Sequence, residues 1–258
     1  MASAFNASGY VLNQGRVFIQ ERQFNGPATG PLKWVGDADS VSLTMSQKKD
    51  EIMDSFTGSG MIVAAPVTET TGELSINVLD MKLQNWAIAT WGDDSGPNAG
   101  GTVSGEAITM FNGEYVKLAN MGVSSVVVSG ATLGTDYVMD TAAHGMLRVL
   151  PGSSAAPDGS PFTTTVSYTY AANNGKVEAF VLGQKYYTVV VAGRNAAQGN
   201  QPTVLTVKQI QLGVAKKFNF IEKKHMVFEL SGSLMYDASL PLASVAGDLS
   251  NLFSWEAA

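Results

Sequence analysis

The chain has 258 residues, no cysteine, a formal net charge of −6 and only 15% charged residues. Its length supplies a core that needs no disulfide or metal, and the lack of cysteine excludes thiolate catalysis, Fe–S clusters and the usual structural zinc sites. The acidic balance argues against binding of nucleic acid phosphates, and the low charge is typical of a subunit covered by copies of itself or of a secreted β-protein.

The chain shows no signal for export or membrane insertion. Residues 1–6 contain neither a basic region nor the apolar core of a secretory signal. No run of 18 apolar residues occurs, which predicts no membrane-spanning helix. We therefore expect assembly in a cytoplasm and no membrane partner.

Alternation of apolar and polar residues dominates the chain. In residues 40–46, Val41, Leu43 and Met45 alternate with Ser and Thr, and this period of two predicts strands with one buried and one polar face. The segments that alternate in this way are 40–46, 61–67, 73–79 and 226–230. Further strands, rich in Val, Thr and Tyr, are expected at 163–170, 186–192 and 203–212. The predicted fold class is mainly β.

A charged segment, residues 47–57, lies between the strands expected at 39–46 and 60–68. It is too polar for a core and long for a hairpin loop, so we expect an exposed loop. A tight turn at Thr71-Gly72 is expected to lead into the next strand.

Residues 81–91 predict the main helix. Asp80 can cap its first turn and Gly92 can end it, and apolar residues return at spacings of three and four between them. The side chains expected to pack on the sheet are Leu83, Trp86 and Trp91. A second, short helix is expected at 244–255.

Two turn-rich segments, 92–105 and 151–161, interrupt the pattern. We expect a small inserted β-rich unit at 106–182. The β core would then consist of 1–105 and 183–258, the second part including a C-terminal extension.

Candidate catalytic groups are sparse. His144 and His225 have no second histidine or carboxylate at metal-ligand spacing. Ser46 and Lys49 form an S-x-x-K sequence without the companion motifs of penicillin-binding proteins. We therefore expect that the chain is not an enzyme and that it binds neither a metal nor a cofactor.

Two lysine pairs flank aromatic residues near the C-terminus. Lys216-Lys217 and Lys223-Lys224 lie on either side of Phe218 and Phe220. Such a pattern is a weak indication of nucleic acid contact. A solvated turn is the interpretation that we favour, because acidic residues elsewhere in the chain offset each pair.

The order of elements between residues 36 and 93 carries a resemblance. It begins with Gly36-Asp37, continues through a strand, the charged segment, Gly58 and Gly60, and ends with a strand and the helix. This order resembles the tail tube proteins, also called major tail proteins, of long-tailed bacteriophages. Residues 134–140, 145–150 and 166–170 are similar to a β-segment carried by some members of that group.

The resemblance implies a fold and a function. The fold would be a β-sandwich or rolled β-barrel with one flanking helix, and the inserted unit would lie on the tube exterior. Self-assembled hexameric rings would stack into the conduit for DNA ejection in the virion tail, after assembly in the bacterial host cytoplasm. The implied partners are copies of the chain, tape-measure, tail-tip and tail-terminator proteins, a sheath in contractile tails, and double-stranded DNA that passes without sticking.

The pattern of residues suggests roles within this architecture. For the charged segment, a mobile solvated surface loop remains the alternative. The charged segment would form the contact between stacked rings, and one polar sheet face would line the lumen, with Val41, Leu43, Leu74 and Ile76 packing under the helix against Trp86. The residues of the stacking contact are Lys48, Lys49, Asp50, Glu51, Ile52, Met53, Asp54 and Phe56. The residues expected to line the lumen are Ser42, Thr44, Ser75 and Asn77.

Two alternatives remain open. A capsid decoration or head–tail joining protein fits the low charge and absent catalytic groups equally well, although the loop-plus-helix order favours the tube. A carbohydrate-binding β-sandwich would use Trp34, Trp86 and Trp91, but sugar sites need exposed aromatic rings, and two of these lie on the expected buried face of the helix.

Overall fold

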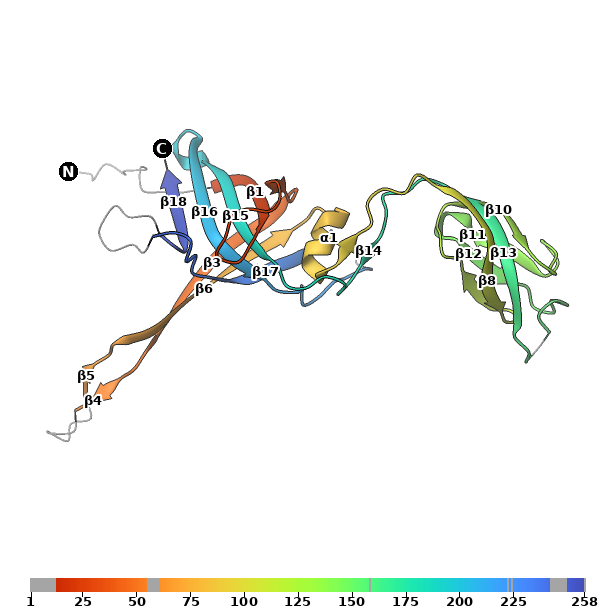
Figure 1. Ribbon diagram of the computed structural model, residues 1–258, viewed down its shortest axis with the longest axis horizontal. Coiled ribbons are helices and arrows are strands. Elements are labelled where there is room, and N and C mark those ends of the chain that lie inside the picture. Colours follow the sequence, from red (N-terminus) through yellow and green to blue (C-terminus); the bar gives the residue numbers. More distant parts are fainter. Residues whose placement is uncertain are drawn as a thin grey trace. The chain divides into compact units, whose positions relative to one another are not determined.

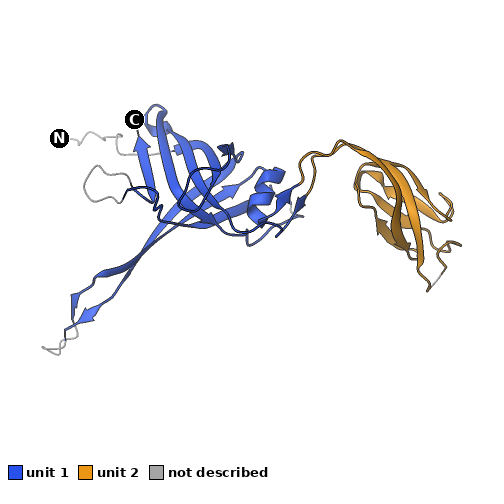
Figure 2. Cartoon of the chain, in the orientation of Figure 1, with its two compact units in different colours: residues 1–94, 177–258 blue, residues 95–176 orange. Residues whose placement is uncertain are grey.

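The computed structural model describes residues 13–54, 61–157, 159–221, 223, 225–241 and 250–257. The fold is mainly β, with 53% strand, 6% helix and antiparallel sheets, which confirms the predicted class. The chain forms two compact units (Figure 2). Unit 1 comprises residues 1–94 and 177–258, and unit 2 comprises residues 95–176. The inserted unit was expected at 106–182.

Unit 1 contains one eight-stranded sheet (Figure 1). The strands in spatial order are β2 (Lys33–Trp34), β1 (Asn13–Arg22), β15 (Tyr186–Asn195), β16 (Gln201–Leu212), β17 (Phe228–Leu234), β6 (Val67–Val78) and β3 (Ala38–Lys49). The C-terminal strand β18 (Phe253–Ala257) pairs with Thr203–Val207 of β16, beside the short β16–β17 pairing at Ile210–Leu212. A strand therefore replaces the C-terminal part of the helix expected at 244–255, and residues 242–249 lie outside the described part.

One face of this sheet forms the core of unit 1. Leu74 and Ile76 of β6, Leu230 of β17 and Val189 of β15 are fully buried on it. Residues 38–41 of β3 and 13–17 of β1, from opposite sides of the sheet, line one cleft. The sheet therefore curls around its apolar face.

The helix α1 (Leu83–Thr90) covers this core and is shorter than predicted. Lys82, without a side-chain cap, occupies the N-cap position instead of Asp80. The Asp80 side chain lies so close to Gly36 that a Cβ there would clash with it, and Gly36 also has a φ of 89°, which favours glycine. The helix ends at Trp91, which takes the left-handed conformation (φ 49°) expected of Gly92, and the Gly92 amide donates to Ala87 O.

A long hairpin extends from the sheet (Figure 1). β3 continues to Lys49 opposite β6, and the short strands β4 (Ile52–Met53) and β5 (Ile62–Ala64) follow. The loop predicted for 47–57 is therefore wrong for its described part, which is mostly strand. The turn predicted at Thr71-Gly72 is wrong as well, because these residues pair with Ser46 and Met45 inside a continuous β6.

Unit 2 has two three-stranded sheets around its own core. One sheet has the order β10 (Val123–Val128), β13 (Phe162–Tyr170), β8 (Gly101–Met110), and the other β11 (Tyr137–Thr141), β12 (Met146–Val149), β9 (Tyr115–Lys117). Tyr137, Leu147, Val166 and Tyr168 are buried between them. The remaining elements of the chain are β7 (Asp93–Asp94) paired with β14 (Val177–Glu178), and the 3-10 turns Ala142–His144 and Ala196–Gln198.

Candidate assembly surface

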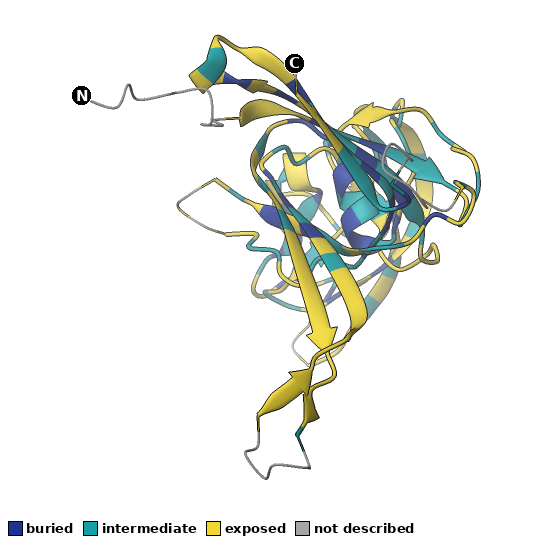
Figure 3. Cartoon of the chain, turned by 90° about the vertical axis from the view of Figure 1, so that its left-hand side faces the viewer, coloured by how far each residue is buried: buried dark blue, intermediate teal, exposed yellow. Residues whose placement is uncertain are grey.

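The hairpin that leaves the sheet is the most exposed regular structure in unit 1 (Figure 3). We call its described residues, 45–54 and 61–72, the arm. All of them except Asp54 and Gly72 are classed as exposed. The half-buried strand predicted for 61–67 is therefore wrong, because both faces of the arm face solvent in the single chain.

Apolar side chains are concentrated at the end of the arm. Five of them are each between 52% and 68% exposed, although aliphatic side chains gain free energy from burial. They are Ile52, Met53, Met61, Ile62 and Val63. Within the described chain these side chains have no core to pack into, so the arm end is an exposed apolar surface.

Charged side chains of both signs precede the apolar end. Lys48 pairs across the ladder with Glu69, and Lys49 with Val67. Asp50 and Glu51 follow and are exposed. Seven of the eight residues predicted for the stacking contact thus lie in one segment of the arm, and the eighth, Phe56, lies outside the described residues.

The four residues predicted to line a lumen lie on neighbouring strands, on the face opposite the core. Ser42 of β3 pairs with Ser75 of β6. Ser75 donates to Glu229 of β17 at 2.6 Å, and the Asn77 amide donates to the Ser40 hydroxyl at 2.9 Å. Thr44, the fourth residue, is opposite Glu73.

This polar face has a consistent chemistry. Ser40, Ser42, Thr44, Ser75, Asn77, Ser231 and Ser233 supply hydroxyl and amide groups, and Glu73 and Glu229 supply the charges. The stretches 40–44, 73–77 and 229–233 contain no lysine or arginine. The face can therefore remain hydrated while offering no cation to a phosphate.

An aromatic cluster joins α1 to the sheet and to the segment between β16 and β17. The Trp86 ring stacks on Phe218 (centroids 4.5 Å apart) and on Phe220 (5.5 Å), and lies 5.9 Å from Phe228 of β17. Val41, Leu43, Leu74 and Ile76 belong to the core cluster of unit 1. The ring contacts of Trp86 come instead from phenylalanines that were not expected to pack on the helix. Trp91 donates from its indole to Leu212 O at 3.2 Å, and Leu83 is half-buried.

The segment 213–221, which we call the α1 loop, runs over the helix. Its backbone is tied to the helix by a bond from the Ala215 amide to Ala89 O at 2.8 Å. Lys216 and Lys217 are exposed, and Phe220 and Ile221 are 76% and 99% exposed. The loop therefore presents basic and apolar groups to solvent together.

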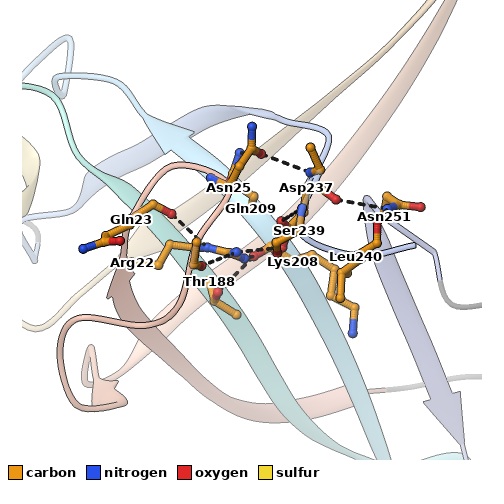
Figure 4. A network of polar contacts seen from close by, with 12 residues as sticks. Arg22, Gln23, Asn25, Thr188, Lys208, Gln209, Asp237, Ser239, Leu240 and Asn251 are labelled. Atoms are coloured by element: carbon orange, nitrogen blue, oxygen red, sulfur yellow. Dashed lines mark hydrogen bonds and ion pairs between the residues drawn. The ribbon is translucent and has the colours of Figure 1, made fainter. Parts of the chain in front are cut away.

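A buried polar network anchors the C-terminal segment (Figure 4). The guanidinium of Arg22 lies 2.7 Å from the carboxylate of Asp237, both side chains being more than nine-tenths buried. Asp237 also accepts from the Ser239 amide and hydroxyl, and its main chain exchanges hydrogen bonds with Asn251. Burial alone would raise the pKa of Asp237, but the bonds from Ser239 and Arg22 outweigh it and the pKa is lowered.

The fully buried Gln209 extends this network. Its side-chain carbonyl accepts a hydrogen bond from the backbone amide of Asn25 at 2.8 Å. Its side-chain amide donates to Asn25 Oδ1 at 3.3 Å. The sequence analysis missed these residues. The Asn25-Gly26 pair was the one local signal, since Asn25 has a φ of 49° that Asn tolerates in turns.

In unit 2 the residues of the second sequence match contribute to the core and include one carboxylate with several hydrogen bonds. The Asp136 carboxylate accepts from Thr132 N (2.8 Å), Ser153 Oγ (2.9 Å), Ser154 Oγ (3.1 Å) and Ala155 N (3.2 Å). Led by the Thr132 and Ser153 bonds, these contacts lower its pKa to about 2. Tyr137 is buried and donates to Val126 O at 3.2 Å. The residues of the second sequence match therefore contribute to the fold of unit 2.

The other candidate groups lie as follows. No cluster of three or more His, Asp or Glu with metal-binding geometry exists among the described residues. His144 lies in a 3-10 turn and His225 is exposed. Trp34 is 40% exposed, and Lys82 lies 4.7 Å from its ring centroid. Within the described residues, no helix has the length and hydropathy to cross a membrane.

One family model matches most of the chain. The model of a family described as Protein of unknown function UCP028589 matches residues 10–254. No curated protein sequence matches the chain.

Proposed function

We propose that this chain, which belongs to the family of unknown function that matches it over residues 10–254, is a structural subunit of the tail tube of a long-tailed bacteriophage. Copies of the chain would assemble into stacked rings that form the conduit for DNA. Tape-measure, tail-tip and tail-terminator proteins would contact the ends and interior of the tube in the virion. In this role the chain is a structural element and not an enzyme.

The arm is the observation that carries the proposal. Five apolar side chains at its end are more than half exposed, and the ladder between β3 and β6 holds them away from the core of their own chain. Full burial of one such side chain contributes roughly 1.5–3 kcal/mol. A partner that covers the arm end would therefore gain a substantial free energy, and a repeating subunit brings that partner with it.

The strand edges of unit 1 support assembly from copies. Within the described part of the chain, β3 pairs only with β6, so the opposite edge of this 12-residue strand is open. A long open edge favours unwanted pairing unless another element covers it. Rings in which each sheet continues into the next would remove these edges, and the curl of the sheet suits such closure.

The polar face supports a lumen for DNA. Its hydroxyl groups and its glutamates Glu73 and Glu229 offer no cationic partner to the phosphates. The glutamates repel the DNA phosphates and do not bind them. Physiological salt limits the range of this repulsion to about 8 Å. A duplex would therefore slide past such a surface.

Electron microscopy tests the proposal directly. The purified chain, negatively stained over a rising range of concentration, is expected to show rings and hollow tubes with an open channel. Single rings that never stack would favour a head–tail joining protein instead. A chain that remains monomeric in sedimentation velocity at every concentration and binds a glycan on an array would contradict the tube.

A further inference from the structure

We infer that the arm of one copy docks on the α1 loop of the next copy along the tube. The inference rests on the proposed function and adds the receiving surface, which the function alone does not identify. Two surfaces of unit 1 carry it, the arm end and the α1 loop, because each exposes large apolar side chains and their charges are opposite.

The arm end is acidic and apolar. Residues 50–54 contain three acidic residues and no base, with Ile52 and Met53 between them. Asp50 and Glu51 are exposed, and Ile52 and Met53 are 52% and 54% exposed. On the opposite strand, Ile62 pairs with Met53 and continues the apolar surface.

The α1 loop and the residues after it are basic and apolar. Residues 216–224 contain four lysines and one glutamate. Lys216 and Lys217 are exposed and make no ion pair with a described residue. The Phe220 ring stacks on Trp86 at a centroid distance of 5.5 Å and an interplanar angle of 19°, and yet 76% of the residue is exposed. Ile221 beside it is almost completely exposed.

The two surfaces belong to opposite ends of the same strand. β6 leaves the arm at Val67 and ends at Val78, and α1 begins at Leu83. At about 3.3 Å per residue, β6 alone separates them by about 36 Å. An arm therefore cannot reach the α1 loop of its own chain, and a contact between the two surfaces requires a second copy.

A contact between different ends of identical subunits is heterologous, and such contacts propagate into open assemblies unless a rotation closes them. This is the geometry that stacking requires. The acidic and basic groups would fix the register of the contact, and the apolar side chains of both surfaces would supply the buried area. Because the Phe220 ring already stacks on Trp86, less side-chain freedom would be lost on the receiving side.

Disulfide cross-linking between full-length chains tests the contact. The chain has no native cysteine, so Met53→Cys and Ile221→Cys each introduce a single thiol at an exposed position. A mixture of the two variants is oxidised at the concentration where assembly begins, and intact mass distinguishes the mixed adduct from the homodimers. The control replaces Ile221→Cys by Thr163→Cys, an exposed position of unit 2.

We expect the adduct of the Met53→Cys and Ile221→Cys chains to exceed that of the control pair on the order of tenfold. The charge reversal Asp50→Lys/Glu51→Lys should reduce the adduct by a similar factor, and Lys216→Glu/Lys217→Glu on the partner chain should restore it, because opposed charges meet again. Glu114→Lys/Asp140→Lys in unit 2 changes the net charge equally and should leave the adduct unchanged. Equal yields for the test and control pairs would overturn the contact.

The outcomes separate this inference from the proposed function. Tubes with equal cross-linking in test and control pairs would leave the tube in place and overturn the docking surface. Preferential cross-linking without tubes would support the contact and contradict the tube. If Lys216→Glu/Lys217→Glu abolished DNA binding by the chain and left the adduct unchanged, the loop would be a nucleic acid surface and the inference would be wrong.

Discussion

Asn85 in α1 donates a hydrogen bond of 2.6 Å from its side-chain amide to the backbone carbonyl of Val35. The same amide donates to Asp80 O at 2.8 Å, and the side chain is fully buried. One residue thus fastens the helix both to the segment that precedes β3 and to its own entry loop.

Replacement of Asn85 by alanine should lower the free energy of unfolding of unit 1 by about 2–3 kcal/mol, because one buried and one partly buried carbonyl lose their donor. All four tryptophans lie in unit 1, so urea denaturation followed by tryptophan fluorescence reports on this unit alone. Gln84→Ala is the control, since Gln84 makes one exposed bond of 3.2 Å to Trp34 O. Equal losses in both variants would show that the buried bonds of Asn85 do not stabilise unit 1.

The Arg22–Asp237 pair should hold the C-terminal segment on the sheet. Asp237→Asn keeps the shape but leaves the buried guanidinium without its countercharge, and breaking such a pair costs about 3–5 kcal/mol. Hydrogen exchange at β18 should accelerate more than exchange at β1. The double variant Arg22→Met/Asp237→Leu should recover part of the loss, because it removes both charges. Unchanged exchange at β18 would contradict the anchoring role.

Acid should destabilise unit 2 through Asp136. Its pKa is about 2 in the folded chain against 3.8 ordinarily, so its stabilising contribution is complete above pH 3.8 and is lost as the pH falls towards 2. In calorimetry, unfolding of unit 2 is the transition that is not accompanied by a change in tryptophan fluorescence, because unit 2 contains no tryptophan. The midpoint temperature of this transition should fall as the pH is lowered over this range. In Asp136→Asn that transition should be lower at neutral pH and less sensitive to acid. Asp140→Asn, an exposed control, should behave as the parent chain.

The sequence predicted the sheet best where one strand face is buried. In residues 73–79 the alternation identified Leu74 and Ile76 as core, and both are fully buried. The signal is strong there because burial selects every second residue. The presence of the helix followed from the same kind of signal, but its ends did not, since Asp80 packs against Gly36 instead of capping.

The arm and the buried polar network escaped prediction for physical reasons. A hairpin exposed on both faces has no burial to impose a period, so its charged residues were interpreted as a loop, and Thr71-Gly72 was interpreted as a turn although it pairs within the ladder. The network brings together residues that are far apart in sequence: Arg22 pairs with Asp237, and Gln209 donates to Tyr236 O beside it. A local sequence pattern cannot predict a contact between residues so far apart in the chain.

The polar face predicts how DNA would respond to a cation in the lumen. Asn77→Lys should leave tube formation unchanged, because the side chain lies on the exposed side of the sheet, but should make assembled tubes retain DNA in a salt-dependent manner. Co-sedimentation of tubes with linear duplex at low and high salt measures this retention. Thr163→Lys in unit 2 adds the same charge outside the proposed lumen. Equal retention by both variants would exclude this face as the lining.

The apolar side chains at the arm end should matter for assembly and not for folding of the single chain. Ile52→Ser/Ile62→Ser removes two apolar side chains that are each 52% exposed, so the free energy of unfolding of the single chain should change by less than about 0.5 kcal/mol per site. Assembly should be lost or shifted to much higher concentration, because the same side chains would be buried between copies. Sedimentation velocity over a concentration series measures the shift. Val127→Ser, a change of the same kind at a side chain of unit 2 that is 64% exposed, is the matched control. Tubes that form equally well from the arm variant and the control would mean that the apolar arm end is not an assembly contact.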